Sequence, residues 1–493
     1  MLGPRAFAVP RSCGLARCCM NAGRSLGRPR QVVLSGSLCL ILLVGCVRCT
    51  AAEAQALAPA PAPHAAAVEA TFTLTQMIDL ALARNRDLHM AADVTDHYQQ
   101  LRAEARAEYF PKIGNFSEVS HITDRQGIVL PAGVFGTPPA TGAIPAESIR
   151  VDQGASTTYF ASTQIKQPLS QLFAIRQANR MAESDVATSR QKEQETRLEV
   201  ANTVRSLFYE TLVSAKNLEA VEAQLAALKE AEHEAIAATA LGSTLRSDTL
   251  EVEVDQAKAL TAVAQARANL HASQLKLCDT AGIALDTRLA LLPPDPPPSG
   301  FTGFPSREEA LQLALAQEPR VLIAEEAVTR ARAAVKGAEL AYVPGISAQA
   351  HESYQSGIAF FEHNYGVFSG QVTVDLFDGG TRNAKIRDAK ALLAQAETAL
   401  AAQRESTRIA VEVTYDQVDE AMADLEAKQM MVKAQQENER LAVASFDNGE
   451  LLPSKRDTAT AARTTAEAAL LESTLNLALA RSQIQRVLGE IPR

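Results

Sequence analysis

The chain has 493 residues, a formal charge of −9 at pH 7 and no tryptophan. Because the acidic balance comes without a basic stripe, we expect no nucleic-acid partner. Apolar residues make up 47% of the chain but aromatic residues only 5%, so alanine supplies much of the apolar content. A composition rich in Ala, Leu, Glu and Gln is typical of long packed helices.

The first 50 residues differ from the rest. Arginines precede an apolar run from Val32 to Val47, which is shorter than the roughly 20 residues of a membrane-spanning helix. A basic segment followed by a short apolar one is typical of a secretory signal. Leu43–Cys46 resembles the lipobox of bacterial lipoproteins, which predicts acylation of Cys46. Ordinary cleavage near residues 52–54 is the alternative.

Cysteine use agrees with export. Six of the seven cysteines lie in this leader, and only Cys278 lies beyond it. Cys46 and Cys49 have the CxxC spacing of redox and zinc sites, but inside a signal we expect neither. An exported protein with one thiol has no internal disulfide, so packing must hold it together.

Residues 51–70 form an Ala/Pro-rich linker, and the first structural repeat follows over 71–290. Thr75 is the expected N-cap of a helix that continues to about Tyr109. Strands are expected over 115–124 and 159–166, separated by a loop rich in Pro and Gly. A helix from about Ala174 to Thr239 comes next, then a reversal at Gly242 and an antiparallel helix ending at Gly282.

A Pro-rich connector over 291–300 leads to the second repeat, 301–493. Phe368–Leu376 alternates apolar and polar residues, which predicts a strand with one apolar face. Two adjacent glycines, Gly379 and Gly380, allow a tight turn. A helix is then expected from Ala384 to Asp447, with a reversal at Gly449 and a second helix to Gly489.

The two repeats are a tandem duplication. Adding 207 to a residue number brings Phe208 onto Tyr415 and Gly242 onto Gly449. Adding 233 brings Tyr109 onto Tyr342 in the segment before the strands. The two offsets differ because the first repeat contains a longer loop between its strands.

Each repeat supplies two strands, so one chain offers four. Four strands cannot close a barrel, and an open sheet edge in lipid leaves unpaired backbone groups that cost several kcal/mol each. Small membrane barrels have about eight strands or more. A homotrimer with 12 strands is the natural solution, and a dimer with eight is the lesser option. The expected fold is therefore mixed α and β: long antiparallel helical hairpins that form an α-helical barrel, plus four transmembrane strands per chain that complete a 12-stranded β-barrel as a trimer.

Several segments carry a resemblance to a known family: Leu376–Arg382, Ala444–Gly449, Leu241–Gly242, Ser247–Asp248, Asn476–Ala480 and Val487–Gly489. With the duplication, strand order and helix lengths over residues 71–489, the chain resembles the TolC-like outer membrane efflux proteins. The resemblance implies a trimeric outer-membrane channel with a long periplasmic extension. Its implied partners are a periplasmic adaptor (membrane fusion) protein, an inner-membrane transporter and outer-membrane lipid.

The resemblance also suggests two sites. It places the helix reversals at the far periplasmic end, where an adaptor docks: Gly242, Leu245, Ser247, Asp248, Gly449, Leu452 and Ser454. A helix C-cap in the left-handed region is the simpler role for each tip glycine. The strand-to-helix junction of the second repeat is the other site: Asp378, Gly379, Gly380 and Arg382. The first repeat departs from this pattern, since Ser170–Ala174 replaces the glycine pair.

No motif predicts chemistry. The sequence has no phosphate-binding GxxxxGK[ST] loop and no HExxH, and its eight histidines are scattered. We therefore expect no enzyme, cofactor or metal site. The predicted function is a passive outer-membrane conduit of a tripartite efflux system. A conduit for type I polypeptide secretion is the alternative, and a soluble coiled-coil scaffold explains neither the strands nor the leader.

Overall fold

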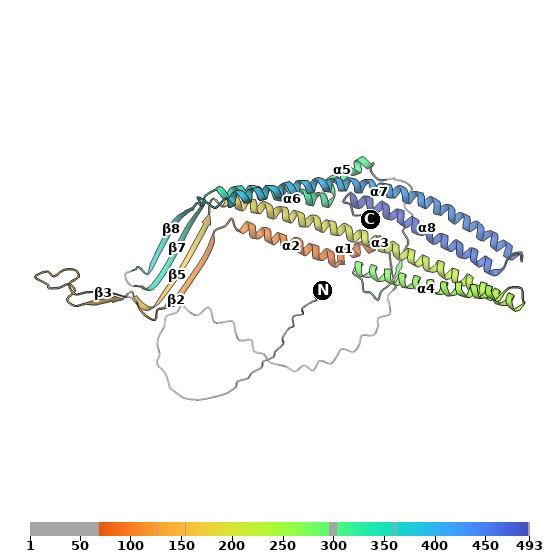
Figure 1. Ribbon diagram of the computed structural model, residues 1–493, viewed down its shortest axis with the longest axis horizontal. Helices are drawn as coiled ribbons and strands as arrows, with labels where there is room; N and C mark the ends of the chain where they lie inside the picture. The colour runs from red at the N-terminus through yellow and green to blue at the C-terminus, as the bar shows by residue number, and fades with distance from the viewer. Residues whose placement is uncertain (1–68, 126, 153, 295–302, 359–360, 492–493) are drawn as a thin grey trace, which may run out of the picture. The chain divides into compact units, whose positions relative to one another are not determined.

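The computed structural model describes residues 69–491 except 126, 153, 295–302 and 359–360, and Figure 1 shows the arrangement of its elements. The described residues belong to one compact unit. Cys46 and the rest of the predicted leader lie outside the described residues, as does most of the predicted connector.

Long helices dominate the described chain. The two longest are α3 (Leu172–Ala240) and α7 (Thr381–Asp447), and each reverses into a shorter antiparallel helix, α4 (Arg246–Ala281) and α8 (Pro453–Val487). At 1.5 Å per residue, α3 is roughly 100 Å long. The remaining helices are α1 (Leu74–Arg84), α2 (Arg86–Ala107), α5 (Arg307–Gln317), α6 (Pro319–Glu339) and the 3₁₀ turn η1 (Leu340–Tyr342).

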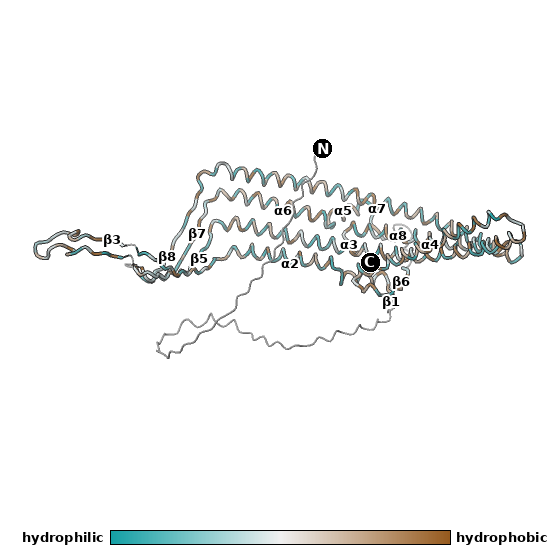
Figure 2. The backbone as a smooth tube through the Cα atoms, turned by 60° about the horizontal axis from the view of Figure 1, so that its bottom comes forward, coloured by the Kyte–Doolittle hydropathy of each residue, from teal (hydrophilic) through white to brown (hydrophobic). Residues whose placement is uncertain are grey.

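The helices form a single layer. Near the strands, α3 contacts α2 and α6, and α6 contacts α7, so the order is α2–α3–α6–α7, as Figure 2 shows. Further along, α3 contacts α4 and α8, and α8 contacts α7, so the order becomes α4–α3–α8–α7. The long helices α3 and α7 run through both parts, and shorter helices fill the positions beside them. No described helix combines the length and apolar character needed to cross a membrane.

A four-stranded antiparallel sheet continues this layer, in the order β2–β5–β7–β8. Its strands are β2 (Lys112–His121), β5 (Gly154–Pro168), β7 (Gly345–Ile358) and β8 (Asn364–Thr373). The hairpin of β3 (Gly127–Leu130) and β4 (Ile149–Asp152) lies in the predicted inserted loop, and β1 (Glu69–Phe72) pairs in parallel with β6 (Arg288–Leu291).

Each repeat has its own core where its short first helix packs on its long helix. In the first repeat, Met77 and Ile78 of α1 meet Val204 and Phe208 of α3, and all four side chains are buried. In the second, alanines of α5 meet Val411, Tyr415 and Val418 of α7. The duplication therefore appears in the packing: Phe208 and Tyr415, which the offset of 207 pairs, occupy the same place in the two cores.

The structure corrects the expected start of the first repeat. The N-cap of α1 is Thr73, whose hydroxyl accepts from the Gln76 amide while the Gln76 side chain accepts from the Thr73 amide. This reciprocal capping box satisfies two amides that Thr75 could not reach together. The expected single helix to Tyr109 is also broken, because Asn85 leaves the helical conformation and caps α2.

The strand limits shift for a pairing reason. The alternation of Phe368–Leu376 continues past the end of β8, which stops at Thr373 because its partner strand β7 begins at Gly345, opposite Thr373. Leu376 and Phe377 remain 92% and 88% exposed beyond the sheet. The predicted long helices, in contrast, agree with α3 and α7 to within three residues at each end.

Candidate functional site

The first predicted tip is the turn between α3 and α4, Leu241–Leu245. Gly242 has a φ of +69°, which residues with a Cβ rarely adopt. The amides of Gly242 and Ser243 donate to carbonyl oxygens in the last turn of α3, both at 3.0 Å, in the Schellman pattern of helix ends. Asp248 accepts from the Leu245 amide at the start of α4, at 3.4 Å. Hydrogen bonds within the tip therefore close this turn.

The second tip, Asn448–Leu452, has the same backbone but different support. Gly449 has a φ of +77°, and the Gly449 and Glu450 amides donate into the end of α7 at 2.9 Å each. The start of α8 is capped by another helix, because the Ser454 amide donates to Glu234 Oε1 at 2.7 Å and the Ser454 hydroxyl donates to Glu234 Oε2. Glu234 belongs to α3, so the first repeat holds the tip of the second.

Six of the seven predicted tip residues are exposed: Gly242, Leu245, Ser247, Asp248, Gly449 and Leu452. Leu245 and Leu452 are 72% and 58% exposed. Ser454 is only 5% exposed. The expectation that Ser454 presents a docking surface is therefore wrong, since its polar groups are used inward to support the turn.

The predicted strand-to-helix junction forms one connected cluster. Asp378 accepts from the Gly380 amide at 3.0 Å, and from the Arg382 amide and Nε at 2.9 and 2.8 Å. Gly379 and Gly380 have φ values of +65° and +85°, so the glycine pair is required by the turn. Hydrogen bonds from the backbone and side chain of Arg382 lower the pKa of Asp378. Gly380 is the N-cap of α7, and the Asp378 carboxylate accepts from an amide in the first turn of that helix.

Arg382 also ties this junction to the neighbouring strand and helix. Its Nη2 donates to the Asp375 carbonyl at 2.6 Å, and its guanidinium lies 5.0 Å from the centre of the Tyr342 ring. In the first repeat the corresponding turn has no glycine pair. There Ser170 Oγ accepts from the Ile346 amide at 2.8 Å, which fixes the turn to β7. Sequence analysis did not identify Tyr342 or Ile346 as part of these junctions.

The sheet has two chemically different faces. The register places most large apolar side chains on one face, where they are exposed: Ile113, Val119, Tyr159, Ile165, Ile346, Tyr354, Phe368 and Val372. The other face carries polar side chains that bond to one another, such as Ser353 to Ser162 at 2.9 Å and Gln349 to Gln371 at 2.7 Å. Such a sheet suits an apolar medium on one side and water on the other.

The sheet and the helix layer are both open at their sides. Within the described chain, β2 pairs only with β5 and β8 pairs only with β7. The β2 edge continues into α2, and the β8 edge continues into α7. One side of the layer therefore comes from the first repeat and the opposite side from the second.

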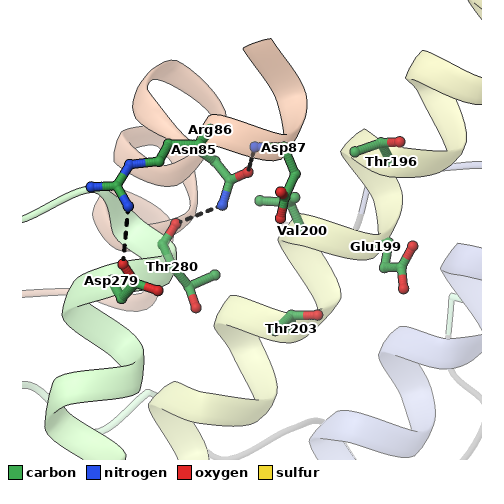
Figure 3. Close-up of a pocket in the computed structure, with 9 residues that line it drawn as sticks. All are labelled: Asn85, Arg86, Asp87, Thr196, Glu199, Val200, Thr203, Asp279 and Thr280. Atoms are coloured by element: carbon green, nitrogen blue, oxygen red, sulfur yellow. Dashed lines mark hydrogen bonds and ion pairs between the residues drawn. The ribbon is translucent and has the colours of Figure 1, made fainter. Parts of the chain in front are cut away.

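A polar hollow of about 520 Å³ lies where α1 gives way to α2, beside α3 and the end of α4 (Figure 3). Asn85 lines it and connects two of its elements: its side chain accepts from the Asp87 amide at 2.9 Å and donates to the Thr280 carbonyl at 3.0 Å. Arg86 and Asp279 form a 3.7 Å ion pair at its rim and are both largely exposed. Among the described residues, no group of three or more His, Cys, Asp and Glu side chains could hold a metal ion. The hollow is best explained as a joint between helices.

Comparison with known proteins agrees with these features. The sequence model of a family described as outer membrane efflux protein matches residues 77–282 and 310–490, one segment in each repeat. A relative, the outer membrane efflux protein BepC of Brucella suis biovar 1 (strain 1330), is 28% identical over 219 residues. That match covers 44% of this chain and 46% of the relative, so it spans about half the relative's length.

Solved structures share the fold at low sequence identity. A membrane protein from Pseudomonas aeruginosa is similar with a TM-score of 0.67 at 17% identity, over 85% of this chain and 90% of that one. The outer membrane protein VceC of Vibrio cholerae gives 0.65 at 14% identity, over 85% and 97%. The MtrE outer membrane channel of Neisseria gonorrhoeae gives 0.62 at 18% identity, over 85% and 89%.

Proposed function

The chain belongs to the outer membrane efflux protein family, and from this premise we propose that three copies form one outer-membrane channel that passively conducts substrates received from a periplasmic adaptor and an inner-membrane pump. Family membership places the chain in the outer membrane, with its helices extending into the periplasm. It also makes the chain a channel component and not an enzyme.

The single observation that carries the trimer is the complementarity of the two open sides. β2 runs away from the helices and β8 runs back toward them, so the β2 of one copy would lie antiparallel to the β8 of the next. The same holds for α2 and α7, which continue these edges. A contact between two different sides of identical chains generates a ring where the rotation between copies closes. Three copies give 12 strands and leave no edge in lipid.

The two faces of the sheet fit this ring. The face with Ile165, Phe368 and Val372 would contact lipid, while the hydrogen-bonded face with Ser162 and Ser353 would line an aqueous lumen. In membrane barrels, apolar residues point outward and polar residues inward.

Disulfide scanning across the proposed edge tests the ring. In a Cys278→Ser background, Ser120→Cys on β2 is combined in turn with cysteine at Tyr365, Val367, Ser369 or Gln371 of β8, which share its face. We expect at least one pair to yield covalent dimers and trimers in native membranes. Ser120→Cys with Phe368→Cys is the control, because Phe368 points to the other face. Monomers from all four pairs would overturn the proposal, and a product that stops at dimers would favour eight strands.

Adaptor docking at the tips is the second part of the proposal. Leu241, Leu245 and Leu452 are exposed apolar side chains on short turns. Hydrogen bonds of backbone and polar groups, which at the second tip include those from Ser454 to Glu234, hold the turns without using these side chains. Exposed leucines on a preformed turn suit burial against a partner. The open neighbourhood of Gly242 and Gly449 agrees with this role, since no atom lies within 4 Å of a Cβ built there.

The test measures efflux and assembly together. Leu245→Glu and Leu452→Glu should raise the accumulation of an efflux substrate in cells while the trimer yield stays unchanged, because a charge would be buried at the contact. Leu285→Glu is the matched control, since Leu285 is 58% exposed and lies away from the tips in the loop after α4. Normal efflux in both tip variants would remove the tips from the functional site.

A further inference from the structure

A second pocket, of about 490 Å³, contains two buried arginines. It lies between the start of α1, the middle of α3 and the last turns of α8. Arg205 of α3 and Arg481 of α8 both line it, with 6% and 9% of their surface exposed. None of the described residues that line the pocket is acidic. Two arginine side chains thus line one small pocket.

Arg205 has few partners for its charge. Among the described residues, its Nε and Nη2 have no hydrogen-bond partner, and no carboxylate forms a salt bridge with it. The phenol of Tyr209, one turn further along α3, interacts with the guanidinium, and burial lowers the pKa of Arg205. A buried unpaired cation is strongly unfavourable, and arginine cannot readily solve the problem by losing its proton.

The other walls of the pocket supply neutral donors. Thr73, Thr75, Ser482 and Gln485 line it with hydroxyl and amide groups. On the far side, the Arg481 guanidinium stacks 4.8 Å from the centre of the Phe304 ring. The Arg205 guanidinium, whose Nε and Nη2 are unpaired among the described residues, lies beside these hydroxyl donors, and this is the chemistry that recognises carboxylate and phosphate oxygens.

The corresponding place in the second repeat contains carboxylates, which the described part of this pocket does not. The offset of 207 brings Arg205 onto Glu412 and Tyr209 onto Asp416. There the nearby cation, Arg307, forms ion pairs with both carboxylates, at 3.0 and 2.8 Å. The second repeat therefore balances its charges within the chain, whereas the described part of the first repeat leaves a cation without its anion.

We propose that the pocket formed by Arg205, Arg481, Tyr209 and Ser482 binds a small oxyanion from solution, a phosphate or a carboxylate. The anion would join α1, α3 and α8 at the point where the two repeats meet. This site is separate from the tips and the sheet edges, and it requires neither the trimer nor the adaptor.

Anion binding should stabilise the folded chain. The purified full-length protein in detergent is unfolded thermally in sodium chloride and in sodium phosphate of equal ionic strength. We expect phosphate to raise the midpoint by roughly 1–2 °C at ten times its dissociation constant, and equilibrium dialysis with labelled phosphate to find one ion per chain. Arg205→Met should lose both effects. The control Arg190→Met removes an exposed arginine from the same helix and should keep both.

Two further variants make the outcome decisive. Arg205→Lys keeps a cation but loses the planar fork, so it should fold and give a smaller phosphate shift even if Arg205→Met does not fold. Asp295 follows the lining residue Pro294 in the sequence and lies outside the described residues, so Asp295→Asn tests a carboxylate of the chain itself. A phosphate response that appears only in Asp295→Asn, that is equal in wild type and Arg205→Lys, or that is absent throughout would overturn the proposal.

Discussion

In each repeat a short helix, α1 or α5, packs on a long helix, α3 or α7, and we call this contact the joint of the repeat. The two joints share their backbone geometry but differ in their charged residues. In the first joint, α1 packs on α3 through an apolar contact, and Leu74 starts α1 beside Arg205. In the second joint, the equivalent of Leu74 is Arg307, which forms ion pairs with Glu412 and Asp416 of α7. The backbone of a duplicated fold is fixed by caps and turns, while the charges at one place can reverse.

The N-terminal caps of the two short helices have the same geometry in both joints. Thr73 and Ser306 begin α1 and α5 with the same capping box, closed by Gln76 in the first repeat and Glu309 in the second. Both side chains offer an oxygen to the N-cap amide, so either satisfies the geometry. Only the carboxylate titrates, however. The repeats therefore share a fold but should respond differently to pH and salt.

The largest difference in the free energy of unfolding should come from substitutions of the two aromatic residues at the centre of the joints. Phe208 is fully buried among apolar residues, so Phe208→Ala should cost about 3–5 kcal/mol. Tyr415 is 4% exposed and its hydroxyl donates to the Pro305 carbonyl at 2.7 Å, so Tyr415→Phe keeps the ring and should cost about 1 kcal/mol. Denaturant unfolding followed by helical circular dichroism measures both. Equal losses would contradict the assignment of Phe208 to the tighter core.

The tips extend the comparison to the other end of the long helices. Glu234→Ala removes the carboxylate that caps α8 from α3 and leaves the polar groups of Ser454 unpaired, so it should cost about 1–3 kcal/mol. Asp248→Ala removes a longer bond within the first tip and should cost about 0.5 kcal/mol. The same unfolding measurement compares them. A larger loss from Asp248→Ala would show that cross-repeat capping does not hold the second tip.

Much of the architecture could be predicted because it repeats. The long helices α3 and α7, and the left-handed turns at Gly242 and Gly449, follow from local periodicity and glycine placement, and the duplication supports each with a second copy. The turn at Asp378 is local in the same way, since the bonds of its carboxylate join residues within four positions. Features of this kind depend on residues that are close together in the sequence, so the sequence predicts them.

What could not be predicted depends on distant residues. Glu234 reaches Ser454 from 220 positions away, and Tyr342 meets Arg382 from the 3₁₀ turn that precedes β7. The buried charge of Arg205 likewise depends on packing by α1 and α8. On sequence alone, Arg205 belongs to a helix full of charged residues. Only the comparison with Glu412, its counterpart in the second repeat, could have marked it as unusual.

A fall in pH should destabilise the second repeat more than the first. Hydrogen bonds from Arg382 lower the pKa of Asp378, and those from Ser306 lower the pKa of Glu309. A carboxylate with a lowered folded-state pKa stabilises the fold above its unfolded pKa, about 4, and this stabilisation is lost as pH falls through the folded pKa. The corresponding residues of the first repeat, Gln171 and Gln76, do not titrate.

Replacing these carboxylates with amides tests the predicted direction of the change in stability with pH. Asp378→Asn and Glu309→Gln should be less stable than wild type at pH 7, and the difference should shrink as pH falls from 5 to 2. The converse variant, Gln76→Glu, should add an acid-sensitive contribution to the first repeat. Thermal midpoints across this pH range measure all three. A difference from wild type that stays constant with pH would show that these carboxylates are not stabilised by their hydrogen bonds.

The smallest effect on the thermal midpoint should come from removing the ion pairs of the second joint. Arg307 contacts Glu412, Asp416 and Asp419 at 2.8–3.0 Å, and hydrogen bonds to Asp416 and Glu412 raise its pKa. All four side chains are well exposed, so solvent and salt screen the attraction. Arg307→Met should lower the thermal midpoint slightly at about 20 mM salt and not at about 1 M, where the Debye length is roughly 3 Å. In the Arg307→Met background, Asp416→Asn should add nothing further, because its partner is gone. A loss that persists at high salt would instead assign Arg307 to packing, through its stacking 5.5 Å from the centre of the Tyr415 ring, and the two joints would then differ less in their chemistry than in their exposure.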